Sequence, residues 1–488
     1  MRLLHRASLL ALLALAAWPA AAQQVITFDE AIRLGLARSL DLREARLGDE
    51  AAALNVTNAR ADVLPLPYVE ASVQPTQRYG LGFDQTTGQL TSQTSESVNV
   101  GVSASLNLFD GFRDQRALAQ ARIERDAAGF TLERASQQVA FDVASRFLQV
   151  LLDAEIVRIR EESLEAQRRQ LADVEALVEA GVRARADVFG QQASVAEAEV
   201  ALLQARQAVE VAKTALVEAL QLDPFGDYVF TAPALDEAAL AAEPVALEPL
   251  LRAAYERRPD LRARERQIAA AEASVRTARA ATLPSVDLFA SLGTGYSSLQ
   301  QRVVAGTTDP TFLPVTTTGG DPVLVGGEPF LFPLQPDPEL EATPLFTQFA
   351  DNRSGSLGLS VTVPLFDRFQ TRRQVQQAEI EVMRRELALE RQRQAIATEV
   401  RQAVLDYRLA GQRLDATAVQ VSAAEAALEA EEVRYELGTG TLVALELARA
   451  RLTEAQSARA QAVYEFVFRR AVIAFALGEL DPTEPLFE

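Results

Sequence analysis

The stretch SVTVPLFDRFQTRRQV, residues 360–375, changes from one kind of structure to another within a few residues. Val361, Val363 and Leu365 alternate with polar residues or proline, which is the period of two that a strand uses. The residues that follow are rich in Arg and Gln, which favours a helix. A close copy, SASLNLFDGFRDQRAL, stands at 103–118. The sequence therefore predicts, twice, a strand that continues into a helix without an intervening loop.

The beginning of the chain has the composition of a signal peptide. Two arginines precede a long apolar run, and Ala20 and Ala22 stand at the positions that a signal peptidase favours. We therefore predict a signal peptide at 1–22 and a mature chain that starts at Gln23, outside the cytoplasm.

Composition excludes several classes of function. The formal net charge is -19 and becomes -21 without the two arginines of the signal peptide, which argues against a nucleic-acid partner. The sequence has no Cys, and its one His, His5, leaves with the signal peptide. Thiol chemistry, His bases, zinc sites with these ligands, disulfides and a lipidated Cys are thereby excluded. We predict no enzymatic activity, no catalytic residue, no metal and no cofactor.

Four short stretches alternate between apolar and polar residues. They are YVEASVQP (68–75), SVNVGVSASLNLF (97–109), VDLFASLGTGY (286–296) and SLGLSVTVPLF (356–366). No apolar run after Gln23 reaches the roughly 18 residues of a membrane-spanning helix, so any membrane span must be a β-barrel. Apolar residues on one face and Ser, Asn, Gly and Thr on the other match that lipid-out, water-in pattern. A half-buried soluble sheet shows the same alternation.

The chain is a tandem repeat. Residues 39–65 match residues 258–284 at an offset of 219, and after the strands the offset becomes 257, so the second copy has gained 38 residues. The gain lies in 293–355, which is rich in Gly, Pro and Thr and is predicted to be a long exposed loop. We expect a first repeat at 23–222, an inter-repeat segment at 223–247, a second repeat at 248–481 and a C-terminal tail at 482–488.

Each copy continues into a very long helix, about 113–180 in the first and 370–437 in the second. A helix of this length spans roughly 100 Å. Apolar residues recur every seven positions, which indicates a seam with left-handed supercoiling. They are Val143, Val150, Val157, Leu164, Leu171 and Val178, matched by Val400, Tyr407, Leu414, Val421, Leu428 and Tyr435. The helices break at Gly181 and Gly438 and the pattern then resumes, with Arg459 as an exception, so each copy contains a helical hairpin.

The four strands also bear on assembly. Asp110 and Asp367 follow the second and fourth strands, where each is placed to cap the helix that begins there. Four strands cannot close a barrel, because small closed barrels have about eight. The chain must then be an oligomer, and a trimer with 12 strands is favoured for a channel that passes water and solutes.

Several motifs in this order resemble one known family. They are PDLR at 259–262, LP before a strand, PLFD at 364–367 and RYELGTGTLVALELARARL at 434–452. Over residues 27–481 the chain is similar to the TolC family of outer membrane efflux proteins, the outer membrane factors. The resemblance implies a mainly α fold: a homotrimer with a 12-stranded transmembrane β-barrel, a periplasmic α-barrel of long antiparallel coiled-coil hairpins, and a mixed belt. We expect DYVF, 227–230, to contribute a short strand to that belt.

The resemblance also implies the function. It predicts a passive exit duct in the outer membrane that extends into the periplasm and serves a tripartite efflux or type I secretion system. Its partners would be further copies of itself, outer membrane lipid, a periplasmic adaptor (membrane fusion protein) and an inner membrane transporter of the RND, ABC or MFS type. The adaptor would dock on the hairpin tips. These are Gly181 and Val182 in the first hairpin, and Gly438, Thr439, Gly440, Thr441 and Leu442 in the second.

One region departs from the family pattern. Ala444 and Leu447 stand where the family has aspartates that ring the periplasmic entrance, and Gly440 stands where it has an arginine. The candidate gate residues are therefore Arg183, Arg185, Asp187 and Glu446. We expect the two arginines to pair with acidic groups and hold the entrance closed; the alternative is that they are exposed and only meet the adaptor.

A different class of protein remains open at this stage. An extracytoplasmic coiled-coil structural or adaptor protein with a soluble β-sheet would also contain long helical hairpins. Such a protein gives no reason to repeat the strand pair and the hairpin twice. Solubility of the mature chain without detergent would favour this alternative.

Overall fold

The computed structural model describes residues 24–83, 89–231, 240–304, 310–334 and 339–480. The predicted signal peptide, 1–22, and the predicted tail, 482–488, lie outside the described residues. The chain divides into two compact units, a helical unit and a strand unit. The helical unit comprises the described parts of Met1–Thr57, Ala119–Ser274 and Gln377–Glu488, and the strand unit comprises those of Asn58–Leu118 and Val275–Gln376.

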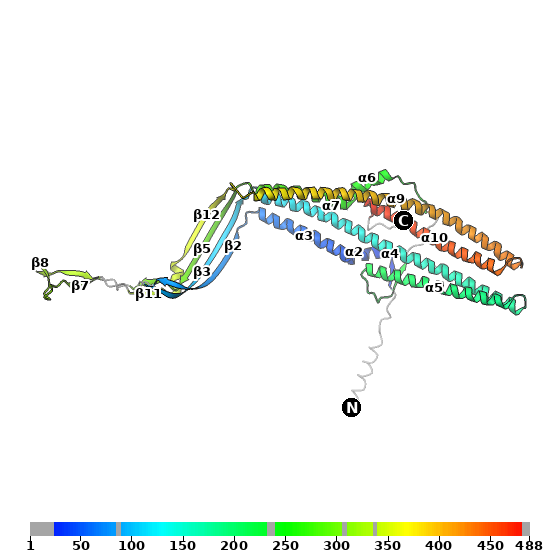
Figure 1. The fold of residues 1–488 in the computed structure, drawn as a ribbon, viewed down its shortest axis with the longest axis horizontal. Coiled ribbons are helices and arrows are strands. Elements are labelled where there is room, and N and C mark those ends of the chain that lie inside the picture. Colours follow the sequence, from blue (N-terminus) through cyan, green and yellow to red (C-terminus); the bar gives the residue numbers. More distant parts are fainter. Residues whose placement is uncertain (1–23, 84–88, 232–239, 305–309, 335–338, 481–488) are drawn as a thin grey trace, which may run out of the picture. The chain divides into compact units, whose positions relative to one another are not determined.

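The strand unit is built on one four-stranded antiparallel sheet (Figure 1). Its strands are β2 (Tyr68–Phe83), β3 (Leu90–Phe109), β5 (Ser285–Ser297) and β12 (Ser354–Thr362), in the order β12-β5-β3-β2. Ala104 of β3 lies opposite Val69 of β2 on one side and Ala290 of β5 on the other. The outer edges of β2 and β12 have no neighbouring strand within the described part of the chain.

The strands differ in length from the sequence prediction. β2 and β3 extend beyond the predicted strands. The sequence did not indicate these extensions, because they contain many polar residues such as Thr, Ser and Gln and show little apolar alternation. β12 is shorter and ends at Thr362, so Val363 and Leu365 do not continue it. Pro364 accounts for this end, because proline cannot donate a ladder hydrogen bond.

The prediction that each strand enters its helix without a loop is wrong. A short turn through Gly111 and Phe112, with φ of 73° and 64°, separates β3 from its helix. Arg368 and Phe369, with φ of 55° and 61°, form the corresponding turn after β12. Left-handed residues reverse the chain locally, and three of these four are not glycine, so the sequence gives little sign of the turn.

The segment 293–355, expected to be a long exposed loop between two strands, is mostly exposed in its described parts and joins β5 to β12, but it also contains secondary structure. Its described parts hold three two-stranded antiparallel ribbons, β6 with β11, β7 with β10, and β8 with β9, and one short helix. The elements are β6 (Gln301–Val303), β7 (Thr311–Pro314), β8 (Leu324–Val325), β9 (Glu328–Pro329), β10 (Leu331–Leu334), β11 (Leu340–Ala342) and α8 (Leu345–Asp351). Thr, Phe and Leu give these short segments their strand preference, which the Gly and Pro residues obscure in the sequence.

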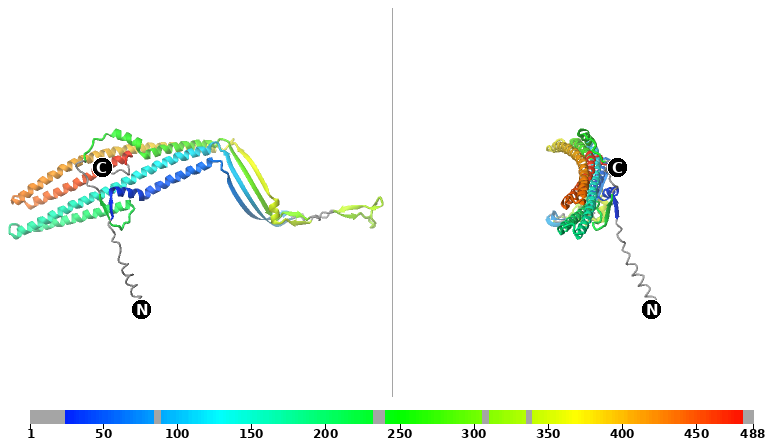
Figure 2. Two further views of the ribbon diagram at one scale, coloured as in Figure 1. Left: turned by 180° about the vertical axis from the view of Figure 1, so that it is seen from behind. Right: turned by 90° about the vertical axis from the view of Figure 1, so that its right-hand side faces the viewer.

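The helical unit contains two long hairpins that lie side by side (Figures 1 and 2). The first is α4 (Arg113–Glu179) with α5 (Arg185–Ala219), and the second is α9 (Gln370–Glu436) with α10 (Leu442–Leu477). The remaining helices are α2 (Phe28–Arg38), α3 (Leu40–Val63), α6 (Leu247–Arg257) and α7 (Pro259–Ala280). The predicted long helices are therefore confirmed to within one residue at each end. No helix among the described residues combines the length and the apolar character that a membrane crossing requires.

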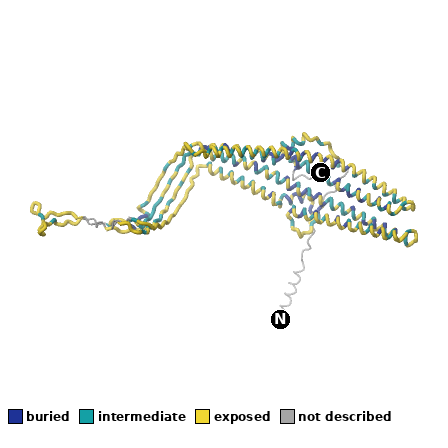
Figure 3. The backbone as a smooth tube through the Cα atoms, in the orientation of Figure 1, coloured by how far each residue is buried: buried dark blue, intermediate teal, exposed yellow. Residues whose placement is uncertain are grey.

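Buried and exposed residues alternate along the long helices (Figure 3), and every predicted heptad position of α4 and α9 is buried or half-buried. Val143, Val150 and Leu164 are buried in α4, and the later positions toward the tip are half-buried. The counterparts in α9 behave alike, with Val400 and Leu414 buried. Arg459, the exception in α10, lies half-buried and its guanidinium donates a hydrogen bond of 2.5 Å to the carbonyl of Leu414.

A mixed β and α core lies near the middle of the hairpins. β1 (Gln24–Thr27) pairs in parallel with β4 (Tyr228–Thr231), so the predicted strand at DYVF is present. Ile26 and Phe28 from the chain's first described residues pack with Phe147 of α4 and Phe230 of β4. The ring of Phe147 meets the rings of Phe28 and Phe230 edge to face, with centroids 5.3 and 5.9 Å apart.

Candidate functional site at the hairpin tips

The tip of the first hairpin is a tight turn around Gly181. Its φ of 75° is left-handed, which glycine adopts at no steric cost. The amides of Gly181 and Val182 donate to the carbonyls of Val178 and Leu177, at 3.0 and 2.9 Å, and so close the end of α4. The predicted docking residues Gly181 and Val182 are both exposed at this turn.

The tip of the second hairpin is longer and more restricted. Gly438 has a φ of 70°, and the amides of Thr439 and Gly440 both donate to the carbonyl of Arg434. A Cβ on Gly440 would lie 2.9 Å from the backbone nitrogen of Tyr435, so a side chain at this position requires the turn to move. Thr441 caps α10 by accepting a hydrogen bond from Ala444 at 3.2 Å. Leu442 is the first residue of that helix.

One contact joins the two tips directly. The guanidinium of Arg183 lies 4.7 Å from the centre of the Tyr435 ring, within the range of a cation–π interaction. Within the described residues of this one chain, neither Arg183 nor Arg185 lies in ion-pair distance of a carboxylate. Asp187 stands in the first turn of α5 and is partly exposed, whereas Arg185 is exposed.

A buried polar layer links the hairpins further from the tips. Gln191 of α5 is only 1% exposed and donates to the side-chain oxygen of Gln167 in α4 at 2.6 Å. Gln167 donates in turn to Oε2 of Glu446 in α10 at 2.7 Å. Glu446, a candidate gate residue, therefore faces the first hairpin within this chain. The other carboxylate oxygen of Glu446 is buried and has no hydrogen-bond partner among the residues that the structure describes.

Arg449 adds the positive charge of this layer. Its guanidinium donates to Gln170 of α4 at 2.9 Å and pairs with Glu432 of α9 at 3.2 Å. It also lies 3.9 Å from Glu446. Side chains of α4, α9 and α10 thus meet at one arginine. Sequence reasoning missed this layer, because Gln and Arg on long polar helices are common and their partners lie on different helices.

The tips also expose large apolar side chains, of which sequence reasoning had assigned only Val182 to docking. Phe189 of α5 and Val443 of α10 are 69% and 77% exposed. Val182, Leu437 and Leu447 are exposed as well. Exposed apolar groups gathered at one end of a molecule indicate an interaction surface.

The strand–helix turns carry the two aspartates that were expected to cap helices. Asp110 accepts hydrogen bonds from the amides of Arg113 and Asp114, at 3.1 and 2.6 Å. Asp367 accepts one from the amide of Thr371 at 2.7 Å. The hydrogen bonds from Thr371 lower the pKa of Asp367 below its ordinary value of 3.8. Burial and the neighbouring Asp110 carboxylate raise the pKa of Asp114 above that value.

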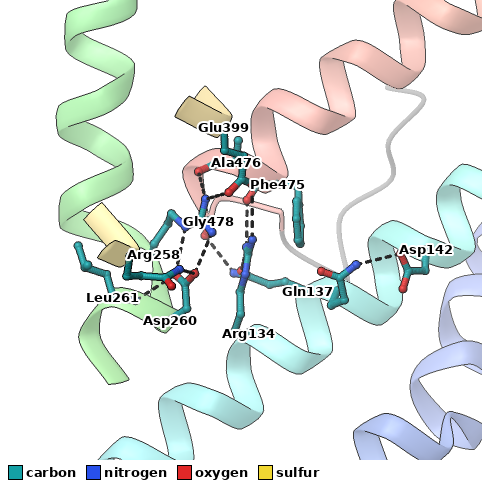
Figure 4. A network of polar contacts seen from close by, with 12 residues as sticks. Arg134, Gln137, Asp142, Arg258, Asp260, Leu261, Glu399, Phe475, Ala476 and Gly478 are labelled. Atoms are coloured by element: carbon teal, nitrogen blue, oxygen red, sulfur yellow. Dashed lines mark hydrogen bonds and ion pairs between the residues drawn. The ribbon is translucent and has the colours of Figure 1, made fainter. Parts of the chain in front are cut away.

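A second buried network holds the end of α10 (Figure 4). Arg258, only 3% exposed, donates to both oxygens of Asp260, at 3.0 and 2.8 Å, to Glu399 at 2.7 Å and to the carbonyl of Ala476 at 3.2 Å. Burial by itself lowers the pKa of Arg258, but the two carboxylates outweigh it and raise that pKa. Burial raises the pKa of Asp260, and Arg258 outweighs this and lowers it.

Arg134 of α4 completes this network (Figure 4). Its guanidinium lies 3.7 Å from the centre of the Phe475 ring and donates to the carbonyl of Phe475 at 3.0 Å. Burial and the nearby charge of Arg258 lower the pKa of Arg134 to about 10. Gln137 donates to the carbonyl of Gly478. The last carbonyls of α10 thus receive donors from α4 and from the residue before α7, where a positive charge is favourable.

Comparison with known proteins agrees with this architecture. A family model described as outer membrane efflux protein matches residues 31–221 and 250–479. The chain is 28% identical to protein CyaE of Bordetella pertussis over 455 residues, covering 92% of this chain and 84% of that protein. It is 25% identical to outer membrane protein TolC of Escherichia coli over 456 residues, covering 91% and 81%.

Solved structures show the same fold. The chain superposes on a crystal structure of CusC with a TM-score of 0.71 at 17% identity, covering 92% of this chain and 91% of that one. It superposes on the open state of the MtrE outer membrane channel of Neisseria gonorrhoeae with a TM-score of 0.68 at 21% identity, covering 94% and 91%.

Proposed function

Because this chain belongs to the family of outer membrane efflux proteins, which are channels that extend from the outer membrane into the periplasm, we propose that it forms a homotrimeric exit duct. Three sheets close one 12-stranded barrel, and the hairpins form a periplasmic α-barrel. The duct is passive and serves a tripartite efflux or type I secretion system. The observation that carries the proposal is the sheet itself, whose edge strands β2 and β12 both lack a neighbour within the described chain.

The internal repeat supplies a partner for each open edge. β3 and β5 pair within the chain, with Ala104 opposite Ala290. The offsets of 257 and 219 carry this pair to Val361 of β12 and Ala71 of β2. We therefore place Val361 opposite Ala71 of the partner subunit. An unpaired strand edge is not tolerated in lipid, so closure by copies of the same chain is the physical requirement.

Helix faces support the same assembly. Leu54 of α3 is 64% exposed, whereas its repeat counterpart in α7, Ala273, is 2% exposed. Leu203 of α5 is likewise 64% exposed, and its counterpart in α10, Ala460, is 7% exposed. We expect such a difference if the contact that buries the surface in one repeat is made within the chain, and the equivalent contact in the other repeat is made with another copy of the chain.

The sheet offers a polar lining for a water-filled channel. One face carries Ser72, Asn99, Ser103 and Ser291, which line a pocket of about 570 Å³. The opposite face carries apolar side chains such as Leu357, which is largely exposed. This is the arrangement of a barrel with a wet interior and lipid outside.

The hairpin tips are the proposed adaptor-docking surface. Docking involves the turns at Gly181 and Gly438 and the exposed side chains of Val182, Phe189 and Val443. The adaptor in turn connects the duct to an inner membrane transporter of the RND, ABC or MFS type. Arg183, Arg185, Asp187 and Glu446 remain the proposed gate of the periplasmic entrance.

Disulfide cross-linking between protomers tests the barrel. The chain has no cysteine, so Val361→Cys with Ala71→Cys introduces the only thiols. Directly opposed residues of antiparallel strands are about 4.5–5.5 Å apart at Cα, within the reach of a disulfide. Oxidation should convert the detergent-solubilised protein to a covalent trimer on a non-reducing gel.

The matched control is Val361→Cys with Tyr79→Cys. Tyr79 is on the same strand and face as Ala71 but lies roughly 26 Å further along it. This pair should stay monomeric on the gel. Cross-linking of the control but not of the first pair contradicts the proposed pairing. A mature chain that is soluble and monomeric without detergent would instead support the coiled-coil structural or adaptor protein.

A further inference from the structure

We propose that residues 310–334 are an apolar β-hairpin that associates with its two copies in the trimer and narrows the outer opening of the duct. The inference rests on the proposed trimer. The hairpin lies in the chain between barrel strands β5 and β12, and its stem is the pairing of β7 with β10. β5 and β12 each lead to the hairpin at one end and to a helix, α7 or α9, at the other. In the proposed duct these helices extend into the periplasm. The hairpin therefore lies at the opposite, outer end of the barrel.

The stem is apolar on both faces. Leu313 is paired with Phe332, and Thr311 with Leu334, which places these residues on one face. Phe312 and Leu331 point to the other face. Phe312 and Phe332 are each 57% exposed, so neither face is covered by the residues that the structure describes. Two-stranded ribbons are marginally stable alone in water and need a surface to pack against.

The charges of the hairpin argue for its own copies as that surface. Residues 310–334 contain Asp321 and Glu328 but no Lys or Arg. An anionic lipid headgroup or an acidic protein requires basic residues to bind, and none is present. The two acidic residues lie toward the turns, where they can stay in water while the stems pack.

The prolines indicate how the copies pack. Pro314 is in β7 and Pro333 is in β10, one in each strand of the stem. Proline has no backbone N–H and blocks the addition of a further strand at an edge. The hairpins are thus protected from edge-to-edge pairing. The stems can therefore bury their side chains only by packing face to face.

The exposed area and the tethering are sufficient for association. Five stem side chains and the adjacent Phe330 together expose roughly 600 Å², near the roughly 800 Å² that one partner buries in a standard interface. They are Phe312, Leu313, Phe330, Leu331, Phe332 and Leu334. Three copies attached to one barrel have an effective concentration on the order of millimolar. Weak stem contacts are then enough to hold the bundle together.

Single-cysteine cross-linking tests the bundle in the intact protein. Phe332→Cys should give covalent dimers on oxidation, because three equivalent thiols leave one unpaired. The control Arg302→Cys is on β6, where Arg302 pairs with Glu341, and should give little cross-link. The Val361→Cys and Ala71→Cys pair reports the trimer separately. If Val361→Cys and Ala71→Cys cross-link but Phe332→Cys gives no dimer, the hairpin bundle alone is overturned. If neither cross-link forms, the proposed trimer is overturned as well.

Conductance and lipid quenching give independent readouts. Leu313→Asp with Phe332→Asp should separate the stems and raise single-channel conductance about twofold or more, because an apolar constriction then becomes hydrated. Unchanged conductance contradicts the proposed narrowing. A bimane label on Phe332→Cys should not be quenched by brominated lipid in vesicles. Strong quenching would assign the hairpin to lipid and overturn the bundle.

Discussion

In the first repeat the chain leaves β3 through Gly111 and Phe112, and in the second it enters α9 through Arg368 and Phe369. These residues correspond at the offset of 257, and all four have positive φ. The first turn is crowded: a Cβ on Gly111 would lie 2.6 Å from the Cβ of Leu283. Arg368 carries a Cβ at the same position and is exposed. The same left-handed backbone conformation is thus adopted by glycine where Leu283 packs against the turn, and by arginine where the turn is exposed.

The proposed trimer explains why the second turn is open. Leu283, which covers Gly111, corresponds to Leu64 at the offset of 219, and Leu64 is exposed at the end of α3. In that trimer, the repeat would bring Leu64 of the partner subunit toward Arg368. The contact of Leu283 with Gly111 within the chain is tight, and the proposed contact at Arg368 would have to leave room for a side chain.

The C-terminal ends of α5 and α10 also differ, but here the glycine stands in the second repeat. Gln221 and Gly478 correspond at the offset of 257, with φ of 51° and 73°. Glycine is required in the second repeat, because a Cβ on Gly478 would lie 3.0 Å from the Cα of Arg258. The first repeat has Ser39 where the second has Arg258. The buried ionic network is therefore a property of one repeat only, and the predictions below test this asymmetry.

The largest effect is expected at Arg258. Arg258→Ala leaves Asp260 and Glu399 without their partner and removes a donor from the end of α10, at a cost of about 3 kcal/mol, because one partner of a buried ion pair is lost. Ser39→Ala at the corresponding position should cost about 1 kcal/mol, the usual value of a helix cap, because the Ser39 hydroxyl accepts a hydrogen bond from the amide of Leu42 at 3.3 Å. Thermal melting followed by far-UV circular dichroism measures both. Equal losses would show that the network does not contribute specifically.

The same network gives a pH dependence. Because the pKa of Asp260 is lowered in the folded protein, its stabilisation is present above its ordinary value of 3.8 and is lost as the pH falls through the lower, folded value. Asp260→Asn should therefore lower the melting temperature at pH 7 and have little effect at strongly acidic pH. A loss that is the same at both pH values would contradict the ionic contribution.

The next effect is expected at the strand–helix turns. Gly111→Ala should destabilise by about 2 kcal/mol, because the residue is left-handed and its Cβ meets Leu283. Arg368→Gly should stabilise by about 1 kcal/mol, since a left-handed non-glycine residue is relieved. The measurement is the denaturant midpoint of the detergent-solubilised protein. A destabilising Arg368→Gly would mean that its side chain makes a contact between protomers.

A smaller effect is expected at the two helix caps. Asp110→Ala should cost about 1 kcal/mol, because the amides of Arg113 and Asp114 lose their acceptor. Asp367→Ala should lower the melting temperature by less, since the helix loses the bond from the amide of Thr371, whereas Asp110→Ala removes two such bonds. Because the pKa of Asp367 is lowered, its contribution should be present above the ordinary value of 3.8 and be lost as the pH falls through the lower, folded value. Equal pH profiles for wild type and Asp367→Ala would contradict the cap.

The smallest effect is expected at the tips. Arg183→Ala with Arg185→Ala removes the contact with Tyr435, a cation–π interaction of about 0.5–1 kcal/mol, and should raise single-channel conductance, more so at low salt. The two single variants, Arg183→Ala and Arg185→Ala, divide the effect between the arginines, because Arg183 is the one whose guanidinium contacts Tyr435 within the described residues. Unchanged conductance together with loss of export would assign these arginines to adaptor docking and end the gating hypothesis.

The long helices and their ends could be predicted, because heptads and tip glycines are strong local signals. Val143, Val400, Gly181 and Gly438 show this directly, since each has the predicted burial or φ. The strand–helix turns could not, because Phe112, Arg368 and Phe369 adopt left-handed φ without being glycine. Such conformations are imposed by packing around them and leave no mark in the local sequence.

The polar networks could not be predicted for a different reason. Arg258 meets Glu399 and Arg134 only after three helices have packed together. The Gln191, Gln167 and Glu446 layer likewise joins residues from α4, α5 and α10. In helices this rich in Gln, Glu and Arg, the sequence alone does not distinguish the buried members from the many exposed ones.

The parallel pairing of β1 with β4 sets an order of events during export. β1 begins at Gln24, one residue after the predicted mature end, and its partner Tyr228 is exported only after the whole first hairpin. Ile26 and Phe28 therefore lack their core partner Phe230 while about 200 residues cross the inner membrane. Contacts between residues this distant in sequence form late in folding. The first repeat therefore reaches its final packing only when the segment that joins the repeats is available to pack with it.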